Sequence, residues 1–383
     1  GNTNAMVNYG SILYNTKEEK KIKQALQLFE KAADLNNTKA LTNLHAMYNQ
    51  GLGVTLNKEK ALEYLQKAVD LGDIIAIRLM GIKYKQGDGV PVDLTKGFEY
   101  YKMAADKGST DDMFLVGLDL RDGSGVEKNT EEALKYFKRG ADLNNVACMV
   151  AYADIYNSGN DVPRNEEEAI KYYSMAKDKN DKTAYERLGC ILLNKDRNSK
   201  EGIDYLKKAA SLGDIDAMSE LAELYQDNDE RPQEDFDQSL CYSMQAYSNG
   251  NTNAMNYIYN LVLKKKIQQD NIPLAIEFVK KAADLGDTTA MVVYVTYLTN
   301  NCEPTPEVLN DQVHYAKLAA DNGNSQGMVC YAVLLQNGLG IEKNIPEAIH
   351  YYKMAADLGN PVGQFFYNQY NRVLSEDEAN QIR

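Results

Sequence analysis

The sequence predicts an all-α protein, a right-handed α/α solenoid of about ten helix-pair repeats of 36 residues. Three observations predict it: a small residue recurs every 33 to 37 residues, two amphipathic helical segments fit each interval, and glycines separate the segments. A unit this short cannot bury its own apolar face, so neighbouring units must stack. The recurrent position holds Ala5, Ala40, Ala76, Asp112, Cys148, Ala184, Ala217, Ala254, Ala290, Gly327 and Gly363 in turn.

The unit at residues 38–73 shows how the first helical segment is recognised. Its apolar and small side chains stand three and four residues apart, which places them on one face of a helix. These side chains are Ala40, Leu41, Leu44, Met47 and Tyr48. Gly51 and Gly53 follow, and glycine can take the positive φ that ends a helix and turns the chain.

The second helical segment of the same unit carries a wide apolar stripe opposite a polar face. The stripe comprises Ala61, Leu62, Tyr64, Leu65, Ala68 and Val69. An aromatic residue recurs in this segment of successive units, as Tyr64, Tyr100, Tyr136, Tyr172, Tyr205, Tyr242, Phe278, Tyr315 and Tyr351. We interpret this aromatic column as core packing beside the small residues that end the segment.

The order of these residues resembles the Sel1-like repeat family of α/α solenoids, and the resemblance extends over essentially the whole chain. The third unit carries the motif most fully, in Ala76, Gly81, Tyr84, Gly87, Asp88, Gly89, Val90, Tyr100, Tyr101, Ala104, Ala105 and Gly108. The resemblance implies an adaptor or scaffold role in protein complexes and supplies no catalytic residues. Tetratricopeptide repeats share the helix pair but run at about 34 residues without the glycine loop, so they are the structural alternative.

We expect one continuous array over residues 1–383 rather than several domains. Its units are expected near 3–37, 38–73, 74–109, 110–145, 146–181, 182–214, 215–251, 252–287, 288–324 and 325–360, with a C-terminal cap at 361–383. Units six to nine lack the Gly-x-Gly loop, so the regular geometry is expected to change there. Within the cap, Ser375 and Glu378 form a capping-box pattern that predicts the start of a short helix.

Composition narrows the range of partners. The formal net charge is −13, whereas binding to nucleic acid or anionic membranes needs clustered basic residues. We therefore expect a protein or peptide ligand and no nucleic acid. No apolar run approaches the roughly 18 residues that span a bilayer, so we expect no direct membrane insertion. Residues 1–6 duplicate residues 250–255, a junction between units, so the chain is expected to begin inside an array.

Residues typical of catalysis or metal binding are sparse, and we expect a non-enzymatic protein with no cofactor and no metal. His45, His314 and His350 are the three histidines. The last two occupy equivalent, solvent-facing positions with no obvious third ligand. The acidic connector at 226–237 lacks the central glycine of a calcium loop and is expected to be solvated. No Walker, Gly-x-Ser-x-Gly or His-Glu-x-x-His motif occurs.

The chain has five cysteines, Cys148, Cys190, Cys241, Cys302 and Cys330. None belongs to a Cys-x-x-Cys motif. The family resemblance implies that secreted members pair cysteines between the two helices of a repeat, and that pattern is missing here. The cysteines therefore favour a reducing compartment, and with it a cytoplasmic location.

The first helix of each unit usually lines the concave face of such solenoids, and its outward side varies between units. In units three to five that side carries Arg78, Ile82, Lys85, Phe114, Leu118, Arg121, Val150 and Asp154. Apolar residues flanked by cations would suit a peptide with a hydrophobic anchor and an acidic flank. The alternative is that the apolar members merely pack between helices. Asn256 and Asn260 share one helix face. Their amides would suit hydrogen bonds to a peptide backbone, and the alternative is that they are ordinary surface residues.

These observations favour a non-enzymatic protein–protein interaction scaffold or adaptor that binds a peptide or protein in its concave groove. Two alternatives stay open. In the first, the chain is the interaction module of a larger enzyme or membrane-anchored protein, as its start inside a unit suggests. In the second, it is a secreted bacterial effector that binds host proteins.

Overall fold

A computed structural model describes residues 2–228 and 230–381. Within those ranges every regular element is a helix and no strand occurs. The predicted all-α fold of packed helix pairs is therefore confirmed. The chain divides into two compact units, residues 1–188 and 189–383, which we call the N-terminal unit and the C-terminal unit and describe separately.

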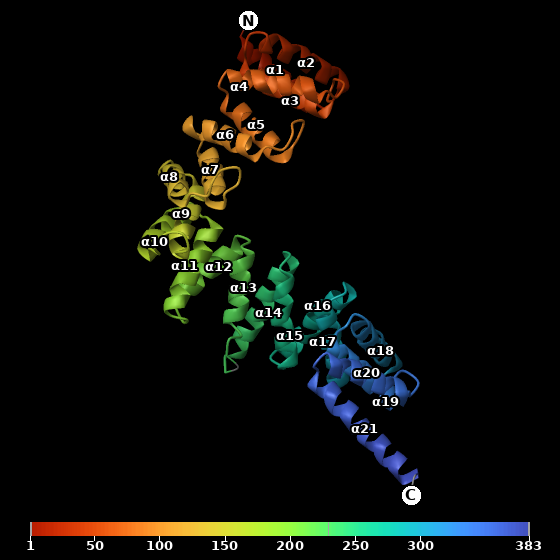
Figure 1. The fold of residues 1–383 in the computed structure, drawn as a ribbon. Helices are drawn as coiled ribbons and strands as arrows, with labels where there is room; N and C mark the ends of the chain where they lie inside the picture. The colour runs from red at the N-terminus through yellow and green to blue at the C-terminus, as the bar shows by residue number, and fades with distance from the viewer. Residues whose placement is uncertain (1, 229, 382–383) are drawn as a thin grey trace. The chain divides into compact units, whose positions relative to one another are not determined.

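The N-terminal unit consists of antiparallel helix pairs that follow one another along the chain (Figure 1). We call the first helix of each pair helix A and the second helix B. The helices are α1 (Thr3–Asn15), α2 (Glu19–Ala33), α3 (Thr38–Gln50), α4 (Lys58–Asp70), α5 (Ile74–Gln86), α6 (Leu94–Asp106), α7 (Thr110–Asp122), α8 (Thr130–Asp142), α9 (Val146–Ser158) and α10 (Glu166–Lys177). The next helix, α11 (Lys182–Lys195), contains the division between the units.

The C-terminal unit continues the same alternation, with two short 3-10 helices at η1 (Thr252–Ala254) and η2 (Gln269–Asn271). Its α-helices are α12 (Lys200–Ser211), α13 (Ile215–Leu224), α14 (Gln233–Ser248), α15 (Met255–Leu263), α16 (Ile272–Asp284), α17 (Thr288–Asn301), α18 (Pro306–Asp321), α19 (Ser325–Asn337), α20 (Ile345–Asp357) and α21 (Pro361–Gln381).

Capping residues and glycines define where the helices begin and end. The Asn37 side chain accepts a hydrogen bond from the Ala40 backbone N–H and so caps α3. Gly51 ends that helix in the left-handed region, at φ 70°, which an L side chain adopts only with strain. Asn57 then caps α4. The predicted helix, glycine turn and second helix are thus present in this repeat.

The recurrent small residue lies where helix A meets the helix B that precedes it. Its side chain is 0 % exposed at every position from Ala40 to Ala290, whereas Ala5, in the first of the described helices, is exposed. At Gly327 the approach is closer still, because a Cβ there would collide with Ala319 of α18. Close helix contact therefore explains why this position is small.

The aromatic column bridges the two helices of a repeat. Tyr84 of helix A stacks on Tyr100 of helix B, with ring centroids 5.6 Å apart and planes inclined by 11°. Tyr172 is buried, at 2 % exposure, whereas Tyr100 is half-buried. The column therefore packs the repeats and keeps part of several rings at the surface.

Two local expectations for the C-terminal unit are wrong. Helix α21 runs without interruption from Pro361 to Gln381, so no short helix starts at Ser375. Helix α14 begins at Gln233, so the second part of the acidic connector is helical rather than a solvated loop. Residues 382–383 of the predicted cap, and Asp229 of that connector, lie outside the described residues.

Candidate partner-binding surface

Eight of the ten residues predicted to bind a partner lie on helices A of the N-terminal unit, and all eight are half-buried. Helix α5 carries Arg78, Ile82 and Lys85, helix α7 carries Phe114, Leu118 and Arg121, and helix α9 carries Val150 and Asp154. We call this set the A-helix surface.

Five members of the A-helix surface line one shallow hollow of about 280 Å³ between α7 and α9, which Asp181 and Thr183 at the start of α11 also line. They are Phe114, Leu118, Arg121, Val150 and Asp154. The residues from α5 are not among its lining. The structure thus brings together the α7 and α9 members of the predicted set around one hollow.

Phe114 contributes both to the core and to the surface. Its ring lies 6.0 Å from that of Phe137, centroid to centroid, with the planes inclined by 50°. Phe137 is fully buried on helix B of the same repeat, whereas Phe114 keeps part of its ring exposed. Core packing accounts for one part of the Phe114 side chain and leaves another part facing solvent.

Arg78 and Lys85 are both engaged with carboxylates of the next repeat. Arg78 forms an ion pair with Asp112, and its Nη2 lies 2.7 Å from the carboxylate Oδ2. Lys85 Nζ lies 2.5 Å from Asp119 Oδ1 and 3.1 Å from Ser124 Oγ. An acidic partner would therefore have to compete with Asp112 and Asp119 for these two cations.

The side chain of Asp119 is buried, although it carries a carboxyl group that pairs with Lys85. Burial raises the pKa of its carboxyl group, and the hydrogen bond from Lys85 opposes that shift. Within the described part of the chain, Oδ2 of Asp119 has no hydrogen-bond partner. Lys85 thus holds a carboxylate for which burial is unfavourable, and the pair joins α5 to α7.

The polar residues nearest the hollow are held less tightly. Arg121 pairs with its chain neighbour Asp122, with Nε 2.7 Å from Oδ1, and its side chain is 37 % exposed. Asp154 accepts a hydrogen bond of 2.6 Å from the Tyr173 hydroxyl and lies 3.4 Å from Arg187 Nε. Exposed ion pairs such as those of Arg121 with Asp122 and of Asp154 with Arg187 stabilise a protein by only about 0 to 1 kcal/mol, so a ligand could displace them at small cost. The hydrogen bond to Asp154 from Tyr173, which is fully buried, would be retained.

Asn256 and Asn260 belong to α15 of the C-terminal unit and are exposed there. They lie one helical turn apart, as the sequence predicts. No hydrogen bond from either side-chain amide to another described residue is present. Both amides are therefore available to solvent or to a ligand on that helix.

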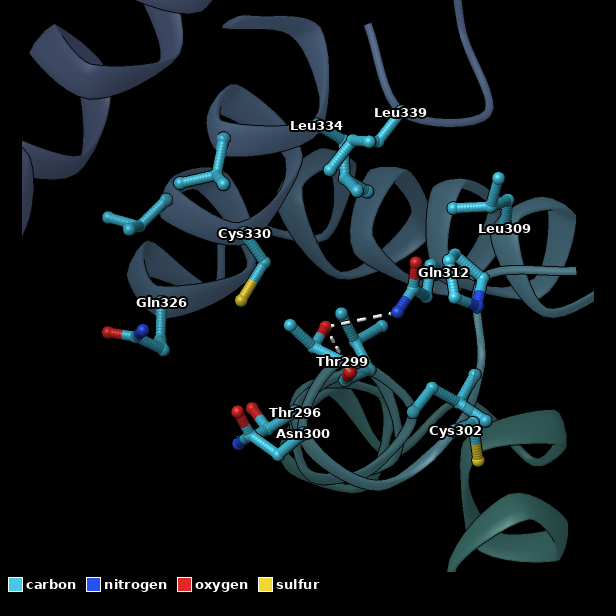
Figure 2. A pocket seen from close by; sticks show the side chains of 15 residues that line it. Thr296, Thr299, Asn300, Cys302, Leu309, Gln312, Gln326, Cys330, Leu334 and Leu339 are labelled. Carbon is cyan, nitrogen blue, oxygen red and sulfur yellow. Dashed lines mark hydrogen bonds between the residues drawn. The ribbon is translucent and has the colours of Figure 1, made fainter. Parts of the chain in front are cut away.

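A larger hollow in the C-terminal unit was missed by the sequence analysis. It has a volume of about 390 Å³ and lies among α17, α18 and α19 (Figure 2). Its one sequence signal is the missing glycine loop after α17, and that signal does not reveal a cavity.

The histidines and acidic residues form no metal centre in the part of the chain that the structure describes, since no cluster of three or more potential ligands is present there. His45 is buried, with Nδ1 2.9 Å from the Ala61 carbonyl oxygen, and burial lowers its pKa. In the acidic connector, Arg231 pairs with Asp227 and Asp235 at 2.6 and 3.0 Å. These carboxylates serve an ion-pair network.

None of the described helices combines the length and the apolar character needed to cross a membrane.

The tandem helix pairs, their glycine turns and the small residues at each junction define a TPR-like α-solenoid. The Sel1 repeat family model matches eight segments, and the chain belongs to the Sel1 repeat family. The matched segments are residues 3–37, 39–73, 74–109, 111–145, 146–181, 184–214, 265–287 and 325–360.

Solved structures resemble the fold. One is c5321, a protective antigen of uropathogenic Escherichia coli strains with an SLR fold. The two sequences are 23 % identical, the match covers 99 % of this chain and 82 % of that chain, and the TM-score is 0.59. Another is a Sel1 repeat protein from Oxalobacter formigenes, 26 % identical, with 63 % of this chain and 99 % of that chain covered and a TM-score of 0.52. A search of curated proteins finds no significant match.

Sel1 and related TPR-like repeats generally mediate protein–protein interactions and typically bind proteins or peptides. They are generally non-catalytic scaffolds. The family thus supports the class of function expected from the sequence, at the level of protein interaction.

Proposed function

We propose that this protein is a non-enzymatic interaction scaffold that binds a protein or peptide on the A-helix surface of its N-terminal unit. The observation that carries the proposal is the hollow between α7 and α9, where Phe114, Leu118 and Val150 present half-buried apolar side chains. Apolar side chains anchored in such hollows commonly contribute most of the binding energy of an interface.

The polar groups around the hollow suggest how a partner would be oriented. Arg121 and Asp154 flank the apolar residues, and their ion pairs are partly exposed. A partner with an apolar anchor and one acidic group could exchange Asp122 for its own carboxylate at Arg121. Arg78 and Lys85 would stay with Asp112 and Asp119, because breaking these partly buried pairs would leave charges uncompensated.

The test compares partner capture by variants of the full chain. We expect Leu118→Glu, and separately Phe114→Ala with Arg121→Glu, to lose at least about tenfold in affinity for proteins captured from the source lysate by cross-linking. The matched control is Leu143→Glu, since Leu143 is an exposed leucine at the end of helix B in the same repeat.

Circular dichroism and thermal unfolding separate binding from folding. Leu118→Glu is the decisive variant because Leu118 is a half-buried residue that lines the hollow, whereas changing Phe114 also removes a ring that packs against Phe137. Unchanged capture by a folded Leu118→Glu chain would refute this surface as the binding site. Equal loss in the Leu143 control would show that the effect is not specific to the hollow.

A further inference from the structure

The hollow among α17, α18 and α19 is lined by side chains none of which is charged. Its apolar lining includes Leu298, Leu309, Val329, Val333 and Leu334. Figure 2 shows Thr296, Asn300 and Gln326 gathered at one side, with Leu309, Leu334 and Leu339 at the other. Its volume of about 390 Å³ falls in the range of ligand sites in proteins.

The hollow arises from a local change in the repeat. After α19, residues 338–344 form a long glycine loop before α20, as in the regular repeats. After α17 the connector comprises only residues 302–305, and α18 begins with Pro306. The first turn of α18, which begins with Pro306, thus takes the place of the glycine loop. As a result, the wall of the hollow includes Cys302, Pro304 and Leu309.

The hollow occupies the same repeat positions as the surface proposed in the N-terminal unit. Thr296 and Val333 each lie six residues after the recurrent small residue of their repeat, Ala290 and Gly327. Leu118 holds the same position after Asp112. Side chains at this position face outward from helix A, so the hollow opens on the equivalent face of the C-terminal unit.

The neighbouring charges indicate what kind of ligand would be complementary. Glu303 and Glu307, on the connector and the first turn of α18, are exposed. Neither carboxylate forms an ion pair with another described residue. The hollow thus combines an uncharged apolar interior with acidic groups on the segment that forms its wall. The Asn300 amide offers hydrogen bonds to a peptide backbone, as does the amide NH₂ of Gln326, whose oxygen already accepts a hydrogen bond from Asn360.

We propose that this hollow binds a protein segment whose apolar side chains enter between α17 and α19 and whose flanking lysine or arginine residues meet Glu303 and Glu307. The proposal rests on the scaffold function inferred above and adds a second site with different chemistry. Because the apolar interior contributes affinity and the carboxylates contribute orientation, loss of either should weaken binding.

The site contains its own reporter of occupancy. The Cys330 sulfur points into the hollow (Figure 2), whereas Cys241 is exposed on α14 and does not line it. A segment bound in the hollow should protect Cys330 from N-ethylmaleimide and leave Cys241 reactive. Burial raises the pKa of the Cys330 thiol to about 11, so labelling is best followed at mildly alkaline pH.

The experiment selects random peptides displayed on phage against the full chain and then tests the synthesised peptides. We expect enrichment of an apolar motif flanked by lysine or arginine, at least about fivefold protection of Cys330, and at least tenfold weaker binding to Val333→Glu. Glu303→Gln with Glu307→Gln should weaken binding severalfold. The matched control is Asn310→Glu, which adds the same charge as Val333→Glu but places it on α18, outside the hollow.

The outcomes separate this proposal from the proposed function. Peptides that bind Val333→Glu normally but lose affinity for Leu118→Glu would overturn the hollow and leave the scaffold intact. Peptides without a basic flank, no enrichment at all, or binding without protection of Cys330 would also overturn it. Loss of binding in the Asn310 control would show a general effect of charge rather than occupation of the hollow.

Discussion

Arg78 holds the carboxylate of Asp112 in the next repeat at two points. Arg78 Nε lies 3.0 and 2.9 Å from the two carboxylate oxygens, and Ser109 donates a further hydrogen bond to Oδ2. Asp112 is 0 % exposed and stands where the other repeats have alanine, glycine or cysteine. A charge at this junction is tolerated because the preceding helix A supplies its counterion.

The first prediction concerns this pair. Arg78→Met should lower the free energy of unfolding by about 3 to 5 kcal/mol, because it leaves a buried carboxylate without its partner. Asp112→Ala restores the residue typical of the repeat, and the double variant should regain most of the loss. Urea unfolding measures all four chains. A loss of under about 1 kcal/mol in Arg78→Met would contradict a structural role for the pair.

The second prediction concerns a compensation between Gly140 and Cys148. Most repeats have alanine at both equivalent positions, whereas here the larger cysteine on α9 faces a glycine on α8. A Cβ on Gly140 would collide with the Cys148 sulfur. Gly140→Ala should therefore cost about 1 to 3 kcal/mol by overpacking.

Cys148→Ala should relieve that collision. The double variant should be more stable than Gly140→Ala alone, with a coupling energy of about 0.5 to 3 kcal/mol between the two sites. Thermal unfolding of the four chains provides the measurement. Additive effects would show that the two positions do not share one packing space.

The pairs Arg78–Asp112 and Gly140–Cys148 illustrate how much of the structure can be predicted from the sequence. The period, the glycine turns and the small residues are local signals, and they predict the helix pairs and their stacking correctly. The same regularity exposes Asp112 and Cys148 as departures. It does not reveal that Arg78 and Gly140 compensate them, because each partner lies in a different helix and only the packed structure shows the contact.

The candidate binding surfaces, too, could be predicted from the sequence only in part. The outward positions of helix A could be read from periodicity, and the structure places five of the predicted residues around one hollow. The larger hollow could not be predicted, because it depends on how the 302–305 connector and the first turn of α18 fill space. Arg78 and Lys85 appear in the sequence as free cations, since their carboxylate partners come from the next repeat.

The third prediction concerns acid stability and Asp88. Lys58 and Lys83 each place Nζ 2.8 Å from one of its carboxylate oxygens. These bonds lower the pKa of Asp88 from 3.8 to about 2. A lowered pKa stabilises the folded state above the unfolded value of 3.8, and this contribution is lost as the pH falls towards 2.

Asp88→Asn should therefore be less stable than the wild type at neutral pH. The difference between the two chains should stay constant down to about pH 5 and shrink as the pH falls further to about 3. Urea unfolding at each pH measures it. Glu63→Gln, which removes one exposed negative charge elsewhere in the unit, is the control for net charge and should show no such convergence. A difference that does not depend on pH would show that the carboxylate charge is not what stabilises this turn.

The fourth prediction concerns the order in which thiols react. Cys241 is exposed, whereas Cys148 is buried and its pKa is raised to about 12 by burial. Because the thiolate is the reactive species, Cys241 should be modified by a disulfide reagent at neutral pH well before Cys148. Peptide mapping by mass spectrometry distinguishes the two sites. In urea the difference should largely vanish, since unfolding removes the burial that separates them, and rapid modification of Cys148 in the native chain would contradict the packing of α9 against α8.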